Sequence, residues 1–263
     1  MNSQSATFNT LHKAFQGDSE ITKQMLISLT RVITMKSSPI LSGNRGVGKE
    51  RLAHACHTAL DRKGKFRVLD CAKFNDESIS KKILSVQNCG SEFIFPQDCK
   101  NGDTLFIKNI DKLNRQYQGL FLSVLEKNNF SKFDTPPLSE RSFYIIFSSV
   151  QNLRELQFKK VLREDLFFRM SGIEVRVPSL QHRISDLPDL IEQIVFDFQE
   201  TTGRQFLKPD FAPEAYSVMA NYSWPENVDE LNRVIWRACD DCAGQRIYAE
   251  DIRKLIQSAK TVS

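Results

Sequence analysis

The sequence has 263 residues, of which 41% are hydrophobic and 26% are charged, as is typical of a soluble globular protein. Its net charge of +4 is small and both signs are interleaved, so charge alone does not predict nucleic-acid binding. There is no apolar run of about 18 residues and residues 1–10 are polar, which predicts neither a membrane span nor a signal peptide. The six cysteines are irregularly spaced and do not suggest a disulfide framework, so we expect a cytoplasmic protein.

Strand and helix patterns alternate as far as Pro178. The runs at 104–107 and 143–147 are fully apolar, as buried parallel strands should be. This alternation predicts an α/β fold with a doubly wound parallel sheet, in a nucleotide-binding-like domain over residues 1–178. The predicted strands lie at 38–41, 66–69, 104–107, 143–147 and 173–177, and the clearest helices at 49–60 and 116–127.

The pattern becomes helical after Pro178, which predicts a small all-helical domain over residues 179–263. The run 201–204 is the clearest break between its helices. Cys239 and Cys242 form a C-x-x-C within one of them, but no second Cys or His pair follows, so we predict no metal site. The predicted helices cover 186–200, 212–222, 226–239 and 249–258.

A glycine-rich loop follows the first predicted strand and precedes the first helix, in the pattern G-x-x-x-x-G-K. Its glycines let backbone N–H groups close around a phosphate, while the helix offers its positive N-terminus and the lysine reaches the outer phosphates. The sequence therefore predicts a phosphate site, the alternative being a glycine-rich turn that binds nothing. The loop residues are Gly43, Asn44, Arg45, Gly46, Val47, Gly48, Lys49 and Glu50.

Four runs carry a resemblance to one family, in the family's own order, across roughly residues 15 to 255. They are residues 41–57, which contain Gly-Lys-Glu, residues 102–107 (Gly-Asp-Thr-Leu-Phe-Ile), residues 162–169 (Leu-Arg-Glu-Asp-Leu-Phe-Phe-Arg) and residues 224–231 (Trp-Pro-Glu-Asn-Val-Asp-Glu-Leu). The sequence resembles the AAA+ central domain of sigma-54-dependent transcription activators. The resemblance implies a P-loop sheet domain, a helical lid domain, and ATP or ADP as the ligand.

The family's catalytic acids are replaced in this sequence. In the family an Asp-Glu pair ends the Thr-Leu-Phe strand, where the Asp helps to hold Mg²⁺ and the Glu polarises the attacking water. Lys108 and Asn109 stand there, and Asp111 follows three residues past the Asp place. Phosphoryl transfer depends on both missing groups, so we expect no bound Mg²⁺ and no ATP hydrolysis, unless another acid substitutes.

Three further departures bear on function. Val150 stands in place of the family's sensor Asn, and Asp229 in place of the nucleotide-facing Arg of the lid, where an acid would repel a triphosphate. The loop with which family members engage the sigma factor has no counterpart in residues 79–101. Remodelling of a sigma-54 polymerase is therefore not expected.

Two arginines of the family pattern persist. Arg163 and Arg169 match residues that family members present to a neighbouring subunit's nucleotide, where arginine stabilises the transferring phosphoryl group. The alternative is that they form surface salt bridges with Glu164 and Asp165. The first interpretation predicts a protein partner, possibly an intact AAA+ activator. The sequence carries no helix-turn-helix after the lid, so direct DNA binding is not expected.

Three functions stay open. The first is a regulatory pseudo-ATPase that acts in transcription regulation by binding a nucleotide or a protein, and the second is a working ATPase with a rearranged site. The third is a receptor for a cyclic dinucleotide or another nucleotide, with which the cations near the loop (Arg45, Lys49, Arg51 and Lys108) are compatible. The Lys108-Asn109 pair favours the first function over the second.

Overall fold

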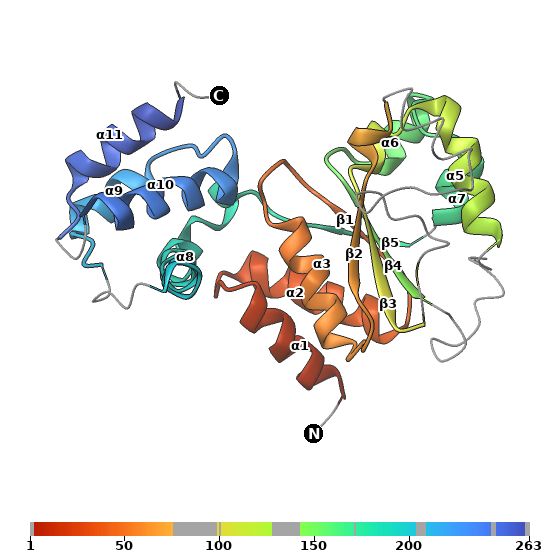
Figure 1. Ribbon diagram of the computed structural model, residues 1–263, viewed down its shortest axis with the longest axis horizontal. Helices are drawn as coiled ribbons and strands as arrows, with labels where there is room; N and C mark the ends of the chain where they lie inside the picture. Colours follow the sequence, from red (N-terminus) through yellow and green to blue (C-terminus); the bar gives the residue numbers. More distant parts are fainter. Residues whose placement is uncertain are drawn as a thin grey trace. The chain divides into compact units, whose positions relative to one another are not determined.

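Five parallel strands form one sheet in the order β2-β3-β4-β1-β5 in the computed structural model (Figure 1). The structure describes residues 3–75, 99, 101–127, 143–170, 172–203, 209–242 and 246–260. Strands β3 and β4 are buried on both faces, as their continuous apolar runs predict. The strands are β1 (Pro39–Ser42), β2 (Phe66–Asp70), β3 (Asp103–Lys108), β4 (Phe143–Ser149) and β5 (Ile173–Arg176).

Helices cover both faces of this sheet, which gives the predicted α/β architecture. In Figure 1, α1, α2 and α3 lie on one face and α5, α6 and α7 on the other. The second layer buries Phe121, Leu156 and Leu166 against the sheet. The helices are α1 (Ser3–Ala14), α2 (Glu20–Thr34), α3 (Lys49–Ala59), α5 (Arg115–Lys127), α6 (Leu153–Phe158) and α7 (Glu164–Met170), with short 3₁₀ helices η1 (Cys71–Asn75) and η3 (Ile110–Lys112).

The five predicted strands and the two helices predicted among them are present, with ends shifted by one or two residues. Two helices that precede the first strand, α1 and α2, were not predicted from the sequence. The apolar residues of α2 recur at helical spacing, and Met25, Leu26, Leu29 and Ile33 are buried. Two short helices, α6 and α7, were also not predicted.

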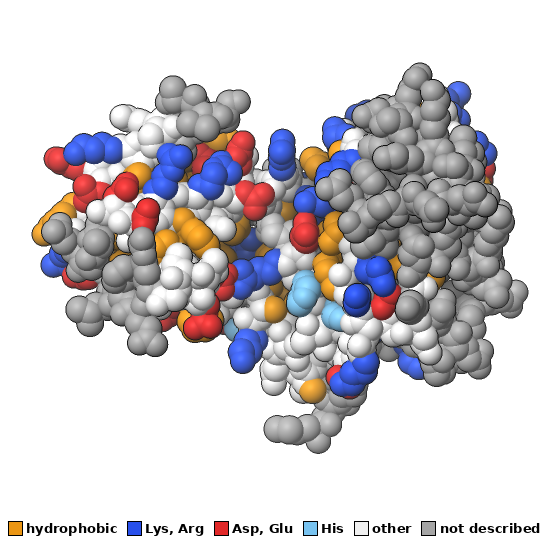
Figure 2. All heavy atoms as spheres, in the orientation of Figure 1, with side chains coloured by type: hydrophobic (Ala, Val, Ile, Leu, Met, Phe, Trp, Pro, Cys, Tyr) orange, Lys and Arg blue, Asp and Glu red, His pale blue; other side chains and the backbone are white. Residues whose placement is uncertain are grey.

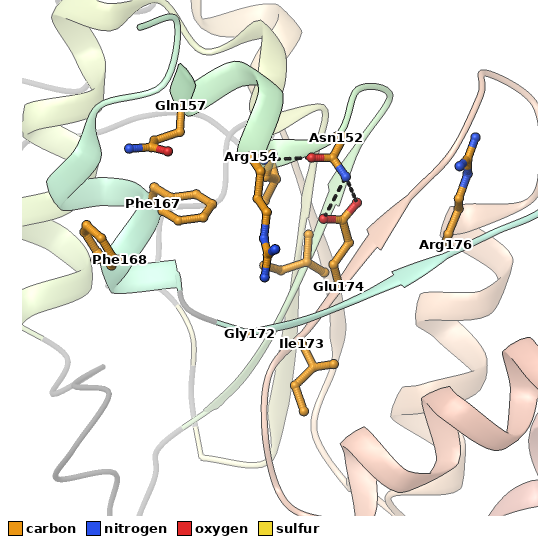
Figure 3. Close-up of a pocket in the computed structure, with 11 residues that line it drawn as sticks. Asn152, Arg154, Gln157, Phe167, Phe168, Gly172, Ile173, Glu174 and Arg176 are labelled. Atoms are coloured by element: carbon orange, nitrogen blue, oxygen red, sulfur yellow. Dashed lines mark hydrogen bonds between the residues drawn. The ribbon is translucent and has the colours of Figure 1, made fainter. Parts of the chain in front are cut away.

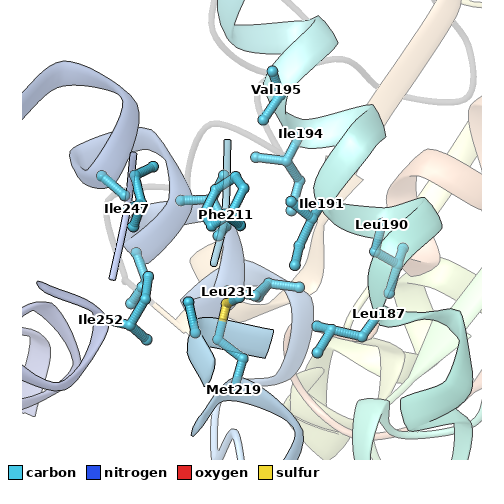
Figure 4. Packing of buried hydrophobic residues seen from close by; sticks show 14 of the residues in the cluster. Leu187, Leu190, Ile191, Ile194, Val195, Phe211, Met219, Leu231, Ile247 and Ile252 are labelled. Atoms are coloured by element: carbon cyan, nitrogen blue, oxygen red, sulfur yellow. The ribbon is translucent and has the colours of Figure 1, made fainter. Parts of the chain in front are cut away.

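A second compact unit contains the helices that follow Pro178. Figure 4 shows its apolar core, where Ile191 and Ile194 of α8 pack with Leu231 of α10 and Ile252 of α11. An isolated parallel bridge joins Phe211 to Ile247. The elements are η4 (Leu180–Asp186), α8 (Leu187–Thr202), α9 (Pro213–Ala220), α10 (Asn227–Cys242) and α11 (Ala249–Lys260), and the four α-helices correspond to those predicted.

Two distant segments belong to this helical unit, residues 15–24 and 44–48. The buried carboxylate of Asp186 anchors the first of them. One of its oxygens accepts from the backbone N–H of Ser19 at 2.7 Å, and the other accepts from the hydroxyls of Ser19 at 2.8 Å and Thr22 at 2.6 Å. A Cβ at Gly17 would lie 2.4 Å from this carboxylate, so the close approach requires glycine. The sequence analysis did not anticipate this grouping.

No helix within the described ranges is both long and apolar enough to cross a bilayer. On the face that Figure 2 shows, basic and acidic side chains are intermingled, as the interleaved charges of the sequence indicate.

Candidate functional site

The predicted phosphate loop lies between β1 and α3, as expected. Gly46 and Gly48 have φ values of 75° and 96°, which residues other than glycine rarely adopt. Lys49 opens α3, and its ammonium donates a hydrogen bond to the carbonyl of Gly43. The local geometry is that of a strand, a glycine turn and a helix N-terminus, on which phosphate-binding loops are built.

An ion pair lies where β3 ends. The Nζ atom of Lys108 is 2.8 Å from Oε2 of Glu50, the last loop residue, and the two side chains are 39% and 49% exposed. An ammonium therefore contacts the carboxylate that adjoins the invariant lysine of the motif. Exposure limits the stabilisation of such a pair to about 1 kcal/mol or less, so its significance is the charge that it places beside the loop.

Asn109 also finds a partner at this edge of the sheet. It has left-handed backbone angles (φ 58°, ψ 46°), and its amide Nδ2 donates to Oδ1 of Asp70 at 2.9 Å. Asp70 ends β2 and is the register partner of Lys108 on β3. Asp70 was not predicted as a site residue, although a polar residue at the carboxyl end of a predicted parallel strand is a local signal.

Asp111 serves β4 rather than the loop. Its Oδ1 accepts from the hydroxyl of Ser149 at 3.2 Å and from the backbone N–H of Val150 at 3.0 Å. Its side chain is fully buried, and Oδ2 has no hydrogen bond. Val150 thus contributes only its backbone, and Asp111 caps the end of a strand.

Within the helical unit, the N-terminus of α10 holds the tip of the loop. The backbone N–H groups of Val228 and Asp229 donate to the carbonyl of Gly46 at 2.9 and 3.3 Å, and the amide of Asn227 donates to the carbonyl of Arg45 at 2.8 Å. A Cβ at Gly46 would lie 1.9 Å from the Glu226 carbonyl oxygen. Asp229 therefore places an acidic residue directly beside the loop.

Arg183 is a buried cation in the same unit. Its side chain donates to the carbonyl of Val47 at 3.0 Å and lies over the ring of Phe15, 4.4 Å from its centroid. Nε and Nη1 are buried without a hydrogen bond. Burial lowers the pKa of Arg183 to about 10, and nearby Asp186 partly opposes that shift. Nothing in the local sequence distinguishes this arginine from a surface residue.

The two family arginines have different surroundings. Arg163 forms a two-point ion pair with Asp165, with Nε 3.0 Å from Oδ1 and Nη2 2.6 Å from Oδ2. The hydrogen bond from Arg163 lowers the pKa of the Asp165 carboxyl. Arg169 instead has a buried Nε that makes no hydrogen bond. The surface salt bridge that the sequence left open is thus present for Arg163.

Two predicted features cannot be compared with the structure. The interval in which the sigma-contact loop is missing, residues 79–101, lies almost wholly outside the described residues, and so does the side chain of Cys242. Within the described ranges, no three His, Cys, Asp or Glu side chains are grouped as metal ligands.

The comparison with family models gives two matches. The model described as the sigma-54 interaction domain matches residues 15–176, and the AAA+ ATPase lid domain matches residues 181–263. The first match alone covers more than half of the chain.

Individual relatives agree with these models. The chain is 27% identical over 240 residues to the transcriptional regulatory protein TyrR of Salmonella typhimurium, covering 90% of this chain and 46% of TyrR. It is 30% identical over 224 residues to the nitrogen assimilation regulatory protein NtrX of Azorhizobium caulinodans, covering 84% and 49%. The chain spans about half the length of these relatives.

A solved structure has the same fold. The crystal structure of NtrX from Brucella abortus in complex with ADP superposes with a TM-score of 0.74 at 25% identity, over 92% of this chain and 55% of that one. The complex of the same protein with ATP gives a TM-score of 0.71 at 25% identity, over 93% and 59%. The chain belongs to the sigma-54 interaction domain family and carries the AAA+ lid domain after it.

Proposed function

We propose that this chain is a regulatory AAA+ module that binds a nucleotide without magnesium, does not hydrolyse it, and acts in transcription regulation through a protein partner. The observation that carries the proposal is the Lys108–Glu50 ion pair at 2.8 Å, which places an ammonium where β3 ends. A fixed cation can neutralise phosphate charge, but it cannot coordinate a metal or polarise a water as a carboxylate would.

Nucleotide binding is supported by the loop and by the relatives. Residues 43–50 would hold the phosphates, with Lys49 as the cation that reaches them. NtrX of Brucella abortus was crystallised with ADP and with ATP, and this chain resembles it over most of its length. Asp229, whose backbone bonds to Gly46, adds negative charge there and favours a diphosphate over a triphosphate.

Magnesium does not fit the residues at this edge of the sheet. Mg²⁺ requires oxygen ligands in a near-octahedral arrangement. Lys108 contributes an ammonium and occupies the Glu50 carboxylate, while Asn109 and Asp70 are bonded to each other. No step of the proposed function therefore involves a metal.

The test is steady-state phosphate release from ATP, with the Lys49→Ala protein as the blank. Both proteins are expected to release phosphate at the same rate, because the groups that position metal and water are missing. Binding is measured in parallel by thermal stabilisation with ADP and ATP in EDTA, where a ligand at 100 times its dissociation constant adds about 2.7 kcal/mol. Turnover clearly above the blank and abolished by Lys49→Ala would establish a working ATPase and refute the proposal.

A partner is proposed on separate grounds. TyrR and NtrX are named as regulatory proteins, which supports a role in transcription regulation. The missing sigma-contact loop in residues 79–101 argues against remodelling of a polymerase. We propose an intact AAA+ activator as the partner, whose active site Arg163 or Arg169 of this chain would complete.

Mixing experiments with a competent activator from the same cell test this partner. An excess of this protein is expected to change the activator's ATPase rate, and Arg163→Ala to remove much of that change. Asp165→Asn, which breaks the ion pair holding Arg163, is expected to enlarge it. Arg253→Ala, an exposed arginine on α11, is the matched control. An unchanged activator rate and oligomer size at excess protein would rule out mixed assembly.

A further inference from the structure

Exposed apolar side chains are concentrated between α6 and β5. Phe158 is 87% exposed, Phe168 51%, Ile173 49% and Val161 44%, all within one stretch of the sheet unit. Two of these residues, Phe168 and Ile173, line one groove, and exposed apolar side chains at a groove can mark an interaction site. None of these four residues belongs to the phosphate loop, and Phe168 also lines a pocket with Arg163.

Part of this patch lines a groove of about 890 Å³ between α6, α7 and β5 (Figure 3). Phe167 and Phe168 form one wall with their rings 5.6 Å apart, and Ile173 lies on the strand side. Figure 3 shows Arg154 reaching from α6 toward the strand between these walls. The groove thus has a mixed lining, with an apolar wall and two cations, Arg154 and Arg176.

The strand along the groove has a free edge. β5 pairs only with β1, and the N–H of Val177 donates to the carbonyl of Ser42 on that side. Since successive residues of a strand present their backbone groups to opposite sides, those of Glu174 and Arg176 face away from β1. Across the described chain, no strand pairs with that outer edge.

The groove's cations are not neutralised by the part of the chain that the structure describes. The guanidinium groups of Arg154 and Arg176 form no ion pair or hydrogen bond with a described residue. The one acid in the lining, Glu174, accepts from the amide of Asn152 at 3.2 and 3.4 Å. The groove is therefore complementary to acidic groups as well as to apolar ones.

We infer that this groove binds an extended acidic peptide segment of a partner protein, which adds as a strand to the outer edge of β5. The backbone of Glu174 and Arg176 would supply hydrogen bonds, as in β-strand addition generally. The apolar side chains of the segment would pack on Ile173 at one face of β5, and its carboxylates, which point to the opposite face, would pair with Arg154 and Arg176. This inference does not depend on nucleotide binding.

The test uses the whole chain and a short fluorescein-labelled peptide in which valine alternates with glutamate, read by fluorescence anisotropy. The glutamate peptide is expected to bind, whereas a valine–lysine peptide and an N-methylated glutamate peptide are not. Arg154→Glu and Ile173→Ser are each expected to weaken binding by at least about tenfold. The matched controls are Arg253→Glu and Phe196→Ser, the latter 58% exposed on α8, which should leave binding unchanged.

Several outcomes would overturn the inference. One is that the glutamate peptide fails to bind, and another is that both peptides bind equally well. A third is that the control variants lose binding as much as the groove variants do. A fourth is that the protein binds only single-stranded oligothymidine and neither peptide. A wild-type dimer that Ile173→Ser converts to a monomer would assign the groove to a second copy instead. Rescue of lysine-peptide binding by Arg154→Glu would support the charge pairing directly.

Discussion

The Lys108→Asp protein is expected to bind ATP more tightly when Mg²⁺ is present, whereas the parent protein binds it equally well with and without the metal. The substitution changes the charge beside the loop by two units and sets a carboxylate against Glu50, which Lys108 now contacts at 2.8 Å. In EDTA the dissociation constant for ATP should rise roughly 10- to 100-fold. Calorimetric titration with ATP in EDTA and in MgCl₂ measures the dissociation constants with and without the metal.

The controls separate charge from metal coordination. Lys108→Gln removes the cation without adding an oxygen anion, so it should weaken binding without creating metal dependence. Lys254→Asp makes the same charge change on an exposed side chain of α11 and should have no effect. Tight binding by the parent protein only with Mg²⁺, or a Lys108→Asp protein indifferent to the metal, would contradict the assignment of Lys108 as the substitute for the metal.

Asp70 adds a third residue to any attempt to restore the two acids at the end of β3. Its Oδ1 is 2.9 Å from the Asn109 amide, so Asn109→Glu alone would bring two carboxylates together. One of the pair would then stay protonated to higher pH, because like charges in contact disfavour ionisation. A variant with Lys108→Asp and Asn109→Glu therefore also needs Asp70→Asn, so that the new carboxylate at position 109 can act as a base.

The sheet could be predicted because its signals are local. The apolar run from Thr104 to Ile107 is buried in β3 as its composition requires, and the loop pattern at Gly43–Glu50 fixed the turn between β1 and α3. The replacement of the family's acids by Lys108 and Asn109 could also be recognised, because these residues directly follow a predicted strand. Such local patterns can be interpreted without knowing which distant residues the fold places beside them.

The side chains that brace the site were not predictable in the same way. Asp70 meets Asn109 across 39 residues, Arg183 meets Val47 across 136, and Asp186 meets Ser19 across 167. Arg183 and Asp186 have roles that come from distant partners, so their own neighbourhoods in the sequence do not indicate those roles, whereas Asp70 could be suspected only from its place at a strand end.

Asp186→Ala is expected to destabilise the helical unit by about 3–5 kcal/mol, because it breaks a buried charged network. The change leaves the N–H and hydroxyl of Ser19 and the hydroxyl of Thr22 without their acceptor, and removes the carboxylate whose charge raises the pKa of the buried Arg183. Asp186→Asn keeps one acceptor oxygen and should cost less.

Urea unfolding followed by tryptophan fluorescence measures this loss selectively, because the two tryptophans, Trp224 and Trp236, both lie in α10 or just before it. The matched control is Glu214→Ala, an exposed acid in the first turn of α9, which should change the free energy of unfolding by less than about 0.5 kcal/mol. If Asp186→Ala shifts the fluorescence transition no more than Glu214→Ala does, then residues 15–24 are not held to the helical unit by this carboxylate. The expected result is a large shift of the fluorescence transition alone. If far-ultraviolet circular dichroism shows a second transition that does not move, then the network stabilises one unit and the two units unfold separately.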